Sequence, residues 1–366
     1  MNFAIRGTFG AGSVVTDPET GAVYSLEGKA GSDAILTASA DDRELNGSPR
    51  DEAMIYDLTL GGNNALRLSG FDVFRLRAGD DVLDLTVRPE NADQPYQRDV
   101  TASGGDGDDI LWTGDGWDFV YGDGVRLTVE PGEDTIDGGA GNDLLWGDAE
   151  DLLDRDGADD IVRGGDGSDF LRGDGSSMPS GQGGNDLLEG GDDDDDLIGD
   201  AYELFEGVGG DDALYGDAGA DEIKGDARQF QGVAGDDNIY GGAGNDYIHG
   251  DAEFGGRAAV GGDDRIEGGT GNDWMWGDVD RRVDGFTSGS DTFVFAPGDG
   301  DDRILDFSTG KDVIDLTAWS FGGLEDLDMS GNGTGEVTIA LDADDRVQVD
   351  VISNDMTLTE DNFLFV

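Results

Sequence analysis

Fifteen apolar residues recur in this sequence at spacings that alternate between nine and about seventeen residues. The intervals are 9, 16, 9, 17, 9, 17, 9, 17, 9, 16, 9, 18, 9 and 18, and an aspartate stands two positions before each apolar residue. An apolar anchor and a carboxylate in fixed register indicate an array of one repeated supersecondary unit. The apolar residues are Leu111, Val120, Ile136, Leu145, Val162, Leu171, Leu188, Leu197, Leu214, Ile223, Ile239, Ile248, Ile266, Met275 and Phe293.

The repeated unit is most complete at residues 138–146, which read GGAGNDLLW. Six residues form a glycine-rich turn, and three form a short strand whose middle residue points inward. Glycine is needed because such tight turns use positive φ angles and leave no room for a Cβ atom. After alternate strands the sequence continues with Gly-Asp and about eight extra residues before the next turn.

One coil therefore contains about 26 residues, in the order strand, tight turn, strand, long turn. Stacked strands lie about 4.8 Å apart, so every tight turn falls on one edge and every long turn on the other. We call these the tight edge and the long edge. The pattern predicts an all-β parallel solenoid.

Composition restricts the partners of such a chain. It has 84 acidic and 22 basic residues, a net charge of −62, which argues against binding to nucleic acids or anionic lipids. It has no cysteine, so disulfides and thiolate metal sites are excluded. No apolar run approaches the roughly 20 residues that span a bilayer, and the first fifteen residues lack the plan of a secretory signal peptide.

Three regions follow from the distribution of repeats. Residues 1–100 are expected to form an amino-terminal β-type cap, with strands at 53–60, 65–68, 72–76 and 82–87, a degenerate repeat at 77–83 and a loop at 88–103. Residues 101–295 form the array. Residues 296–366 are expected to close the solenoid as a carboxyl-terminal cap, with two altered units at 298–304 and 310–314 and strands at 337–341 and 346–352.

The aspartates suggest calcium. Calcium takes six to eight oxygen ligands from carboxylates and backbone carbonyls, and stacked glycine-rich turns supply both. Magnesium requires tighter octahedral geometry, and zinc or copper would require His or Cys, of which only His249 is present. Alternatively, the aspartates merely favour turns, although two ladders of unneutralised carboxylates about 5 Å apart would repel strongly.

The candidate calcium ligands form three series. The tight edge has Asp118, Asp143, Asp169, Asp195, Asp221, Asp246 and Asp273. The long edge has Asp109, Asp134, Asp160, Asp186, Asp212, Asp237, Asp264 and Asp291, and the Gly-Asp series adds Asp123, Asp148, Asp174, Asp200, Asp226, Asp251 and Asp278. Asp302 and Asp312 continue the pattern in the two altered units.

The nonapeptide resembles the Gly-Gly-x-Gly-x-Asp-x-apolar-x unit of repeats-in-toxin (RTX, hemolysin-type) calcium-binding proteins, over about residues 104–315. The resemblance implies a right-handed parallel β-roll with multiple Ca²⁺ ions between adjacent turns. Residues 291–316 also resemble the carboxyl-terminal region of serralysin-type proteases. In that family the tail carries an uncleaved type I secretion signal, and residues 361–366 (DNFLFV) look like one. This chain departs from the family in its long turns, since a plain roll uses two nonapeptides, about 18 residues, per coil.

An enzyme is not expected. One histidine cannot form a His-Glu-x-x-His zinc site, and no Gly-x-Ser-x-Gly motif occurs. His249 follows the inward Ile248, so we expect its side chain to point outward into solvent.

Alternation also predicts an outward aromatic stripe that could bind polysaccharide or a second copy of the chain. Alternatively, the long loops fold back with Phe205, Phe230, Phe254 and Phe286 and cover it. The stripe would contain Phe119, Tyr121, Trp146, Phe170, Tyr247, Trp274 and Trp276, with Trp112, Tyr215 and Tyr240 on the opposite sheet.

Together these features predict a secreted, non-enzymatic calcium-binding β-roll protein whose folding is switched on by extracellular calcium. The first alternative is a cell-surface adhesin or matrix protein that binds polysaccharide through the aromatic face. The second is a polysaccharide-active enzyme.

Overall fold

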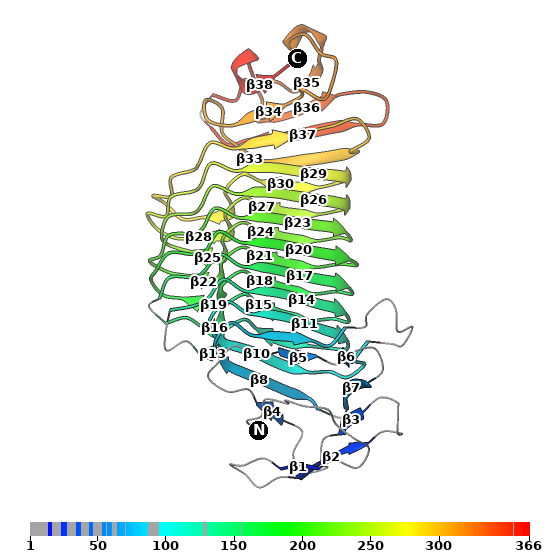
Figure 1. The fold of residues 1–366 in the computed structure, drawn as a ribbon. Helices are drawn as coiled ribbons and strands as arrows, with labels where there is room; N and C mark the ends of the chain where they lie inside the picture. Colours follow the sequence, from blue (N-terminus) through cyan, green and yellow to red (C-terminus); the bar gives the residue numbers. More distant parts are fainter. Residues whose placement is uncertain are drawn as a thin grey trace.

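The structure, a computed structural model, is an elongated stack of coils that runs from the amino-terminal to the carboxyl-terminal end (Figure 1). It describes residues 71–86, 95–126, 130–153, 155–353 and 355–366. Of residues 1–70 it describes the strands, as backbone apart from Leu45. Of the loop predicted at residues 88–103, residues 88–94 lie outside the described residues, residues 95–100 form no regular element, and the end, from Thr101, is a strand. No helix among the described residues is long and apolar enough to cross a membrane.

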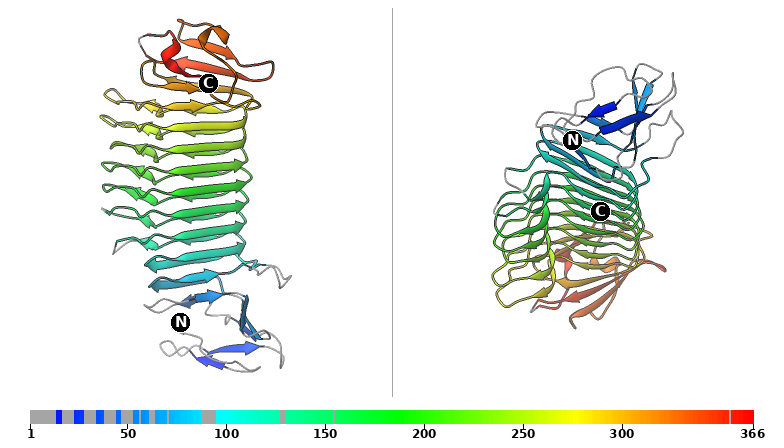
Figure 2. Two further views of the ribbon diagram at one scale, coloured as in Figure 1. Left: turned by 45° about the horizontal axis from the view of Figure 1, so that its top comes forward. Right: turned by 90° about the horizontal axis from the view of Figure 1, so that it is seen from below.

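Each coil contributes one strand to each of two long parallel sheets, which face each other across the solenoid (Figure 2). Sheet 1 holds the strand before each tight turn, and sheet 2 holds the strand after it. In spatial order, the described strands of sheet 1 are β5 (Ala53–Ile55), β9 (Val82–Asp84), β11 (Ile110–Asp115), β14 (Thr135–Ala140), β17 (Ile161–Asp166), β20 (Leu187–Asp192), β23 (Ala213–Ala218), β26 (Asn238–Gly244), β29 (Arg265–Gly271), β32 (Thr292–Val294), β34 (Val313–Asp315) and β38 (Phe363–Leu364).

Sheet 2 follows the same order and continues into an antiparallel meander at the carboxyl-terminal end. Its described strands are β4 (Glu44–Asn46), β8 (Val73–Ala78), β10 (Thr101–Asp106), β12 (Phe119–Tyr121), β15 (Leu144–Trp146), β18 (Phe170–Arg172), β21 (Asp196–Ile198), β24 (Glu222–Lys224), β27 (Tyr247–His249), β30 (Trp274–Trp276), β33 (Asp301–Phe307), β37 (Arg346–Val351), β36 (Glu336–Ala340) and β35 (Asp328–Ser330).

The inward register predicted from the spacing is confirmed. All fifteen apolar anchors are fully buried between sheets 1 and 2, and each pairs with the anchor of the next coil, as Leu188 pairs with Leu214 in sheet 1. The strands of sheet 1 alternate partly exposed and buried positions, as β20 does from Leu187 to Gly190. This stacked apolar column runs the length of the solenoid and provides its main core.

The long turns contain a third parallel sheet, which the sequence pattern did not predict. Sheet 3 stands beside sheet 2 (Figure 1) and follows each Gly-Asp pair directly. Its own small core includes Met178, Leu204 and Phe230. The coil is therefore three-sided, and the long turn is a strand followed by a shorter loop. The strands of sheet 3 are β13 (Gly124–Arg126), β16 (Ala149–Asp151), β19 (Gly175–Met178), β22 (Ala201–Leu204), β25 (Ala227–Phe230), β28 (Ala252–Gly255) and β31 (Val279–Arg282).

Sheet 3 covers part of the aromatic stripe that was expected to face solvent. The last residue of the sheet 2 strands lies beneath it, so Tyr121 and Trp276 are buried and Trp146 is half-buried, its indole Nε1 donating to Ser176 Oγ of β19 at 3.0 Å. Of the two alternatives left open by the sequence, an exposed stripe and a stripe covered by the long turns, the covered one therefore holds for these three side chains. Strand alternation does turn them away from the main core, but a third layer packs there. The aromatic residues that begin sheet 2 strands remain exposed, and they are Phe119, Phe170, Tyr247 and Trp274.

The prediction for His249 was wrong for the same reason. Its side chain is buried and stacks on Trp276, with ring centroids 4.5 Å apart and an angle of 8° between the rings.

Sheets 1 and 2 continue beyond both ends of the repeat array. The degenerate repeat at 77–83 supplies parts of β8 and β9, which pair in parallel with β10 and β11. At the other end β33 and β34 continue the two sheets, and the short 3₁₀ helices η1 (Leu324–Asp326) and η2 (Glu360–Asn362) lie among the final strands. A separate amino-terminal sheet contains β1 (Val14–Thr16), β2 (Val23–Glu27), β3 (Ala34–Thr37), β7 (Asn64–Ser69) and β6 (Asp57–Leu60).

The burial of His249 gives a direct test of the third sheet. Burial, with the nearby Lys224 charge, lowers the pKa of His249 from 6.5 to about 3. Because this is the sole histidine of the chain, its imidazole proton resonances can be assigned without ambiguity by NMR. In the folded protein we expect no titration between pH 8 and pH 5. A titration midpoint near 6.5 would show that sheet 3 does not cover this side chain.

Candidate metal centres along two edges of the solenoid

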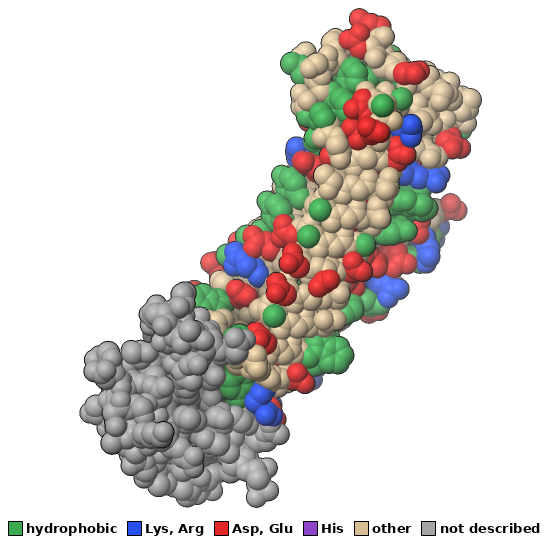
Figure 3. Space-filling model, turned by 90° about the vertical axis from the view of Figure 1, so that its right-hand side faces the viewer, with side chains coloured by type: hydrophobic (Ala, Val, Ile, Leu, Met, Phe, Trp, Pro, Cys, Tyr) green, Lys and Arg blue, Asp and Glu red, His purple; other side chains and the backbone are tan. Residues whose placement is uncertain are grey.

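The aspartates of the tight edge form a hydrogen-bonded ladder. Each carboxylate Oδ1 accepts a hydrogen bond from the backbone N–H of the aspartate one coil earlier, as Asp195 Oδ1 does from Asp169 N at 2.8 Å. The register arises because each aspartate ends a tight turn immediately before a sheet 2 strand. The ladder includes Asp118, Asp143, Asp169, Asp195, Asp221, Asp246, Asp273 and Asp302, with donor–acceptor distances of 2.7–3.0 Å. Figure 3 faces this edge and shows a tan band of backbone and uncharged polar side chains along the solenoid, with acidic side chains beside it.

The long edge repeats this ladder with the aspartates that precede the sheet 1 strands. Asp186 Oδ1 accepts from Asp160 N at 2.7 Å, and Asp212 Oδ1 accepts from Asp186 N at 2.7 Å. The same bond joins successive members of the series Asp109, Asp134, Asp160, Asp186, Asp212, Asp237, Asp264, Asp291 and Asp312. The same hydrogen-bond geometry therefore recurs at both edges.

The aspartates of the Gly-Asp series join the long edge. We call them the junction aspartates, because each stands between the end of a sheet 2 strand and the start of a sheet 3 strand. Asp200 Oδ1 accepts from Gly210 N at 3.0 Å, and Asp226 Oδ1 accepts from Gly235 N at 2.7 Å. They are Asp123, Asp148, Asp174, Asp200, Asp226, Asp251 and Asp278. The long edge thus carries two of these buried aspartates per coil, and the tight edge carries one.

All twenty-four predicted ligands are buried, with none more than 4% exposed. In most of them the second carboxylate oxygen receives no hydrogen bond from the described residues; examples are Oδ2 of Asp169, Asp186 and Asp212. Burial of a carboxylate oxygen without a hydrogen-bond partner costs free energy. A row of such oxygens is stabilised by bound protons or cations.

Backbone carbonyls converge on the same points as these oxygens. A Cβ atom built on Gly199 would collide with both Asp212 Oδ2 and the carbonyl oxygen of Gly225. At the tight edge a Cβ on Gly164 would collide with Asp169 Oδ2 and the Gly190 carbonyl oxygen. Glycine is therefore required where a carboxylate and a carbonyl of the next coil meet. This is the mixture of oxygen donors that calcium prefers.

The pKa values of these carboxyl groups are raised, chiefly by burial and secondly by neighbouring carboxylates. At the tight edge the pKa rises from 3.8 to about 8 for Asp195 and to about 7 for Asp169 and Asp221. At the long edge the pKa values of Asp186 and Asp212 lie well above 3.8. Without a cation, the folded chain would therefore bind protons at these positions near neutral pH.

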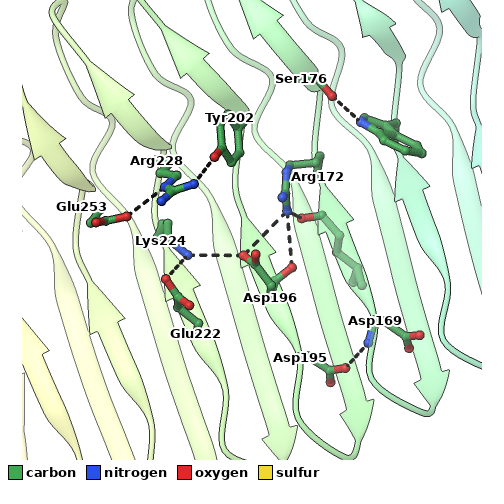
Figure 4. A network of polar contacts seen from close by, with 12 residues as sticks. Asp169, Arg172, Ser176, Asp195, Asp196, Tyr202, Glu222, Lys224, Arg228 and Glu253 are labelled. Carbon is green, nitrogen blue, oxygen red and sulfur yellow. Dashed lines mark hydrogen bonds and ion pairs between the residues drawn. The ribbon is translucent and has the colours of Figure 1, made fainter.

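The ion pairs of the described residues lie mostly outside the two edges. In Figure 4, the buried Lys224 Nζ contacts Asp196 Oδ1 at 3.2 Å. It also contacts Glu222 at 2.9 Å, and Arg228 pairs with Glu253, all at positions away from the candidate ligands. Among the described residues, an ion pair between Arg282 Nη2 and Asp306 Oδ2 at 3.3 Å reaches the buried carboxylates of the long edge.

Two residues of these columns were missed by the sequence reasoning. Asp81 donates its backbone N–H to Asp109 Oδ1 at 2.7 Å and so extends the long ladder into the degenerate repeat. Asp306, 3% exposed, accepts from the backbone N–H groups of Gly277 and Asp278 at 2.7 and 3.2 Å. Asp81 could have been found from its place in residues 77–83. Asp306 has a weaker signal, because Leu305 stands before it instead of glycine.

Comparison with known families agrees with this geometry. Seven segments match the model of the RTX calcium-binding nonapeptide repeat (4 copies), at residues 101–125, 126–151, 156–177, 180–201, 205–227, 229–253 and 259–281. No curated protein matches the chain. The seven matched segments lie within the stretch that carries the aspartate ladders. The chain is therefore an RTX calcium-binding repeat protein, with its repeats folded as a parallel β-solenoid.

Proposed function

We propose that this protein is a secreted, non-enzymatic calcium-binding β-roll whose folding is switched on by calcium outside the cell. The observation that carries the proposal is the row of buried, unpartnered carboxylate oxygens along each edge, such as Oδ2 of Asp169 and of Asp186. These oxygens meet carbonyls of the neighbouring coil, so a cation at each interval would satisfy both.

The same arrangement explains a folding switch. Two carboxylates one coil apart repel by about 3 kcal/mol at an effective dielectric constant of about 20, and each ladder repeats this repulsion along the solenoid. Calcium that binds the folded chain and not the unfolded one offsets this cost in proportion to its concentration. Low calcium in the cytosol would leave the acidic chain unfolded for export, and millimolar calcium outside would fold it.

The carboxyl terminus is the proposed export signal. In the folded chain Phe363 is buried in β38, which pairs with β34, and Val366 is exposed. An export machinery would therefore bind residues 361–366 most easily before the chain folds.

The alternative of a polysaccharide-binding adhesin rests on a smaller aromatic surface than the sequence suggested. Phe119 and Phe170 lie on β12 and β18 of sheet 2, and Tyr247 and Trp274 lie farther along the same sheet, on β27 and β30. Between them the strands β21 and β24 begin with Asp196 and Glu222, which bear charge. Trp146 and Trp276 are too enclosed to be the contact residues.

Circular dichroism tests the calcium switch. We expect β-sheet ellipticity at millimolar calcium and an unfolded spectrum in excess chelator, because the ladders then lack counter-ions. Asp195→Asn should raise the calcium concentration at the midpoint of folding, and Asp328→Asn, an exposed residue of β35, should not. A full β-sheet spectrum in excess chelator at pH 8 would contradict the proposal.

The dependence of folding on pH should reverse sign when calcium is added. In chelator the raised pKa values of Asp169 and Asp195, about 7 and about 8, mean that the folded chain binds more protons than the unfolded chain. Stability should then be greatest at acid pH and be lost as the pH rises through these values. In saturating calcium, protons compete with the ion, so stability should fall as the pH is lowered.

Denaturant titrations at pH 5 and pH 8, each with calcium and with chelator, measure this reversal. Sedimentation at each condition checks that the acid form is not aggregated. The same direction of change in calcium and in chelator would show that the ladder carboxylates are not the groups that bind the ion.

A further inference from the structure

The loops that follow the strands of sheet 3 are unequal in length, and a pocket opens where they differ. Each of these loops lies between the last paired residue of a sheet 3 strand and the next bridge to a neighbouring coil. In three successive coils the loops are residues 205–207, 231–232 and 256–259, which are three, two and four residues long. The short middle loop leaves a hollow between its two longer neighbours.

The hollow is a pocket of about 270 Å³, and the phenyl rings of Phe205, Phe230 and Phe254 line it. Phe230 belongs to the second core and is buried, whereas Phe254 is 40% exposed. Gly256 keeps the space open, because a Cβ atom there would collide with the side chain of Gln231. Small-molecule sites have volumes of about 300–1,000 Å³. A pocket near the lower end of this range fits a single ring with a short substituent.

The pocket offers few polar side chains to an occupant. The amide of Gln229 already donates from Nε2 to Glu203 Oε1 at 2.8 Å. The side-chain amide of Gln231 and the guanidinium of Arg257 complete the polar lining. A sugar ring carries several hydroxyl groups, and each needs a hydrogen-bond partner when it is buried. This lining therefore favours an occupant with an apolar ring and one polar group.

Arg257 places an unpaired positive charge at the pocket. Its guanidinium forms no ion pair or hydrogen bond with the residues that the structure describes, although the chain has 84 acidic residues. Other arginines of sheet 3 have partners, since Arg228 pairs with Glu253 at 2.9 Å (Figure 4) and Arg282 pairs with Asp306 at 3.3 Å. The charge of Arg257 is therefore available to an anion. A guanidinium matches the geometry of a carboxylate, because it can donate two parallel hydrogen bonds.

The backbone beside Arg257 has an unfavourable conformation. Ala258 has a φ of +66°, in the left-handed region that residues other than glycine rarely adopt. The turn around it is closed by a hydrogen bond from Ala259 N to the carbonyl oxygen of Gly256 at 3.4 Å. Residues in such conformations cluster at ligand-binding sites, where the surrounding structure holds them.

We propose that this pocket binds a small aromatic carboxylate, with its ring among Phe205, Phe230 and Phe254 and its carboxylate on the guanidinium of Arg257. Offset and edge-to-face contacts with the three phenyl rings favour an aromatic ring, and the unpaired guanidinium favours an anion. Salt screens the negative charge of more distant parts of the chain beyond about 8 Å. The site adds a ligand to a chain whose proposed function concerns calcium alone.

Ligand-observed NMR titrations of the full chain in saturating calcium test the site with two probes, 3-phenylpropanoate and its neutral amide, 3-phenylpropanamide. Both molecules offer the same ring, so the difference between their affinities measures the carboxylate contact. We expect the wild type to bind the carboxylate about tenfold more tightly than the amide, because hydrogen bonds between charged groups are stronger than neutral ones.

Arg257→Gln should abolish this preference for the carboxylate and keep the affinity for the amide, which would show that the pocket is still folded. Arg163→Gln is the matched control, because Arg163 lies on sheet 1, pairs with Glu189 and carries the same charge. This control should keep the preference. Glucuronate, a carboxylate on a hydroxylated ring, should not displace 3-phenylpropanoate.

Four results would overturn the proposal. The site is wrong if the wild type binds neither probe, or if Arg257→Gln keeps the preference for the carboxylate. An equal loss of preference in Arg163→Gln would assign the effect to net charge instead of to Arg257. Displacement of 3-phenylpropanoate by an equal concentration of glucuronate would identify the occupant as a sugar acid and overturn the aromatic assignment.

Discussion

The structure depends on a hydrogen bond between coils that satisfies only half of each carboxylate. Asp186 Oδ1 accepts the N–H of Asp160, and the same bond recurs along both edges. It aligns each coil with the next, because the donor and the acceptor occupy equivalent positions in successive repeats. It also buries the second oxygen and places like charges in a row. The interaction that sets the register thus creates the need for a counter-ion, and fold and ion binding are two consequences of one contact.

The third sheet changes the chemistry of one edge. Where sheet 2 ends, the chain turns into sheet 3 instead of returning directly to sheet 1, and a junction aspartate stands at each turn. The junction aspartates add a second buried carboxylate to each coil of the long edge, and sheet 3 covers the last residues of several sheet 2 strands. His249 and Trp276 are enclosed for this reason, and the buried Lys224 is held there by Asp196 and Glu222.

The regular part of the fold could be predicted from the sequence, because an apolar residue recurs at each inward position. The spacing of Leu188, Leu197 and Leu214 is sufficient to place two sheets and to locate the aspartates of both edges. Sheet 3 was missed because its strands share no alternation, as GSSM in β19 and ARQF in β25 illustrate. A weaker signal was present in the small residue that follows most Gly-Asp pairs, such as Ala201 and Ala227, which packs in the second core. Strand alternation correctly turns His249 away from the main core. The prediction that its side chain is exposed was wrong, because alternation within one strand cannot predict a further layer.

The most direct test is a crystal structure of the protein grown in calcium, with anomalous data that locate the ions. The account predicts two rows of anomalous peaks, one inside each edge, with successive peaks separated by the spacing of the coils, about 4.8 Å. Ladder carboxylates such as Asp169 and Asp186 should lie at calcium–oxygen distances of about 2.3–2.6 Å. An ordered solenoid whose ladder carboxylates bind only water or protons at both edges would contradict it.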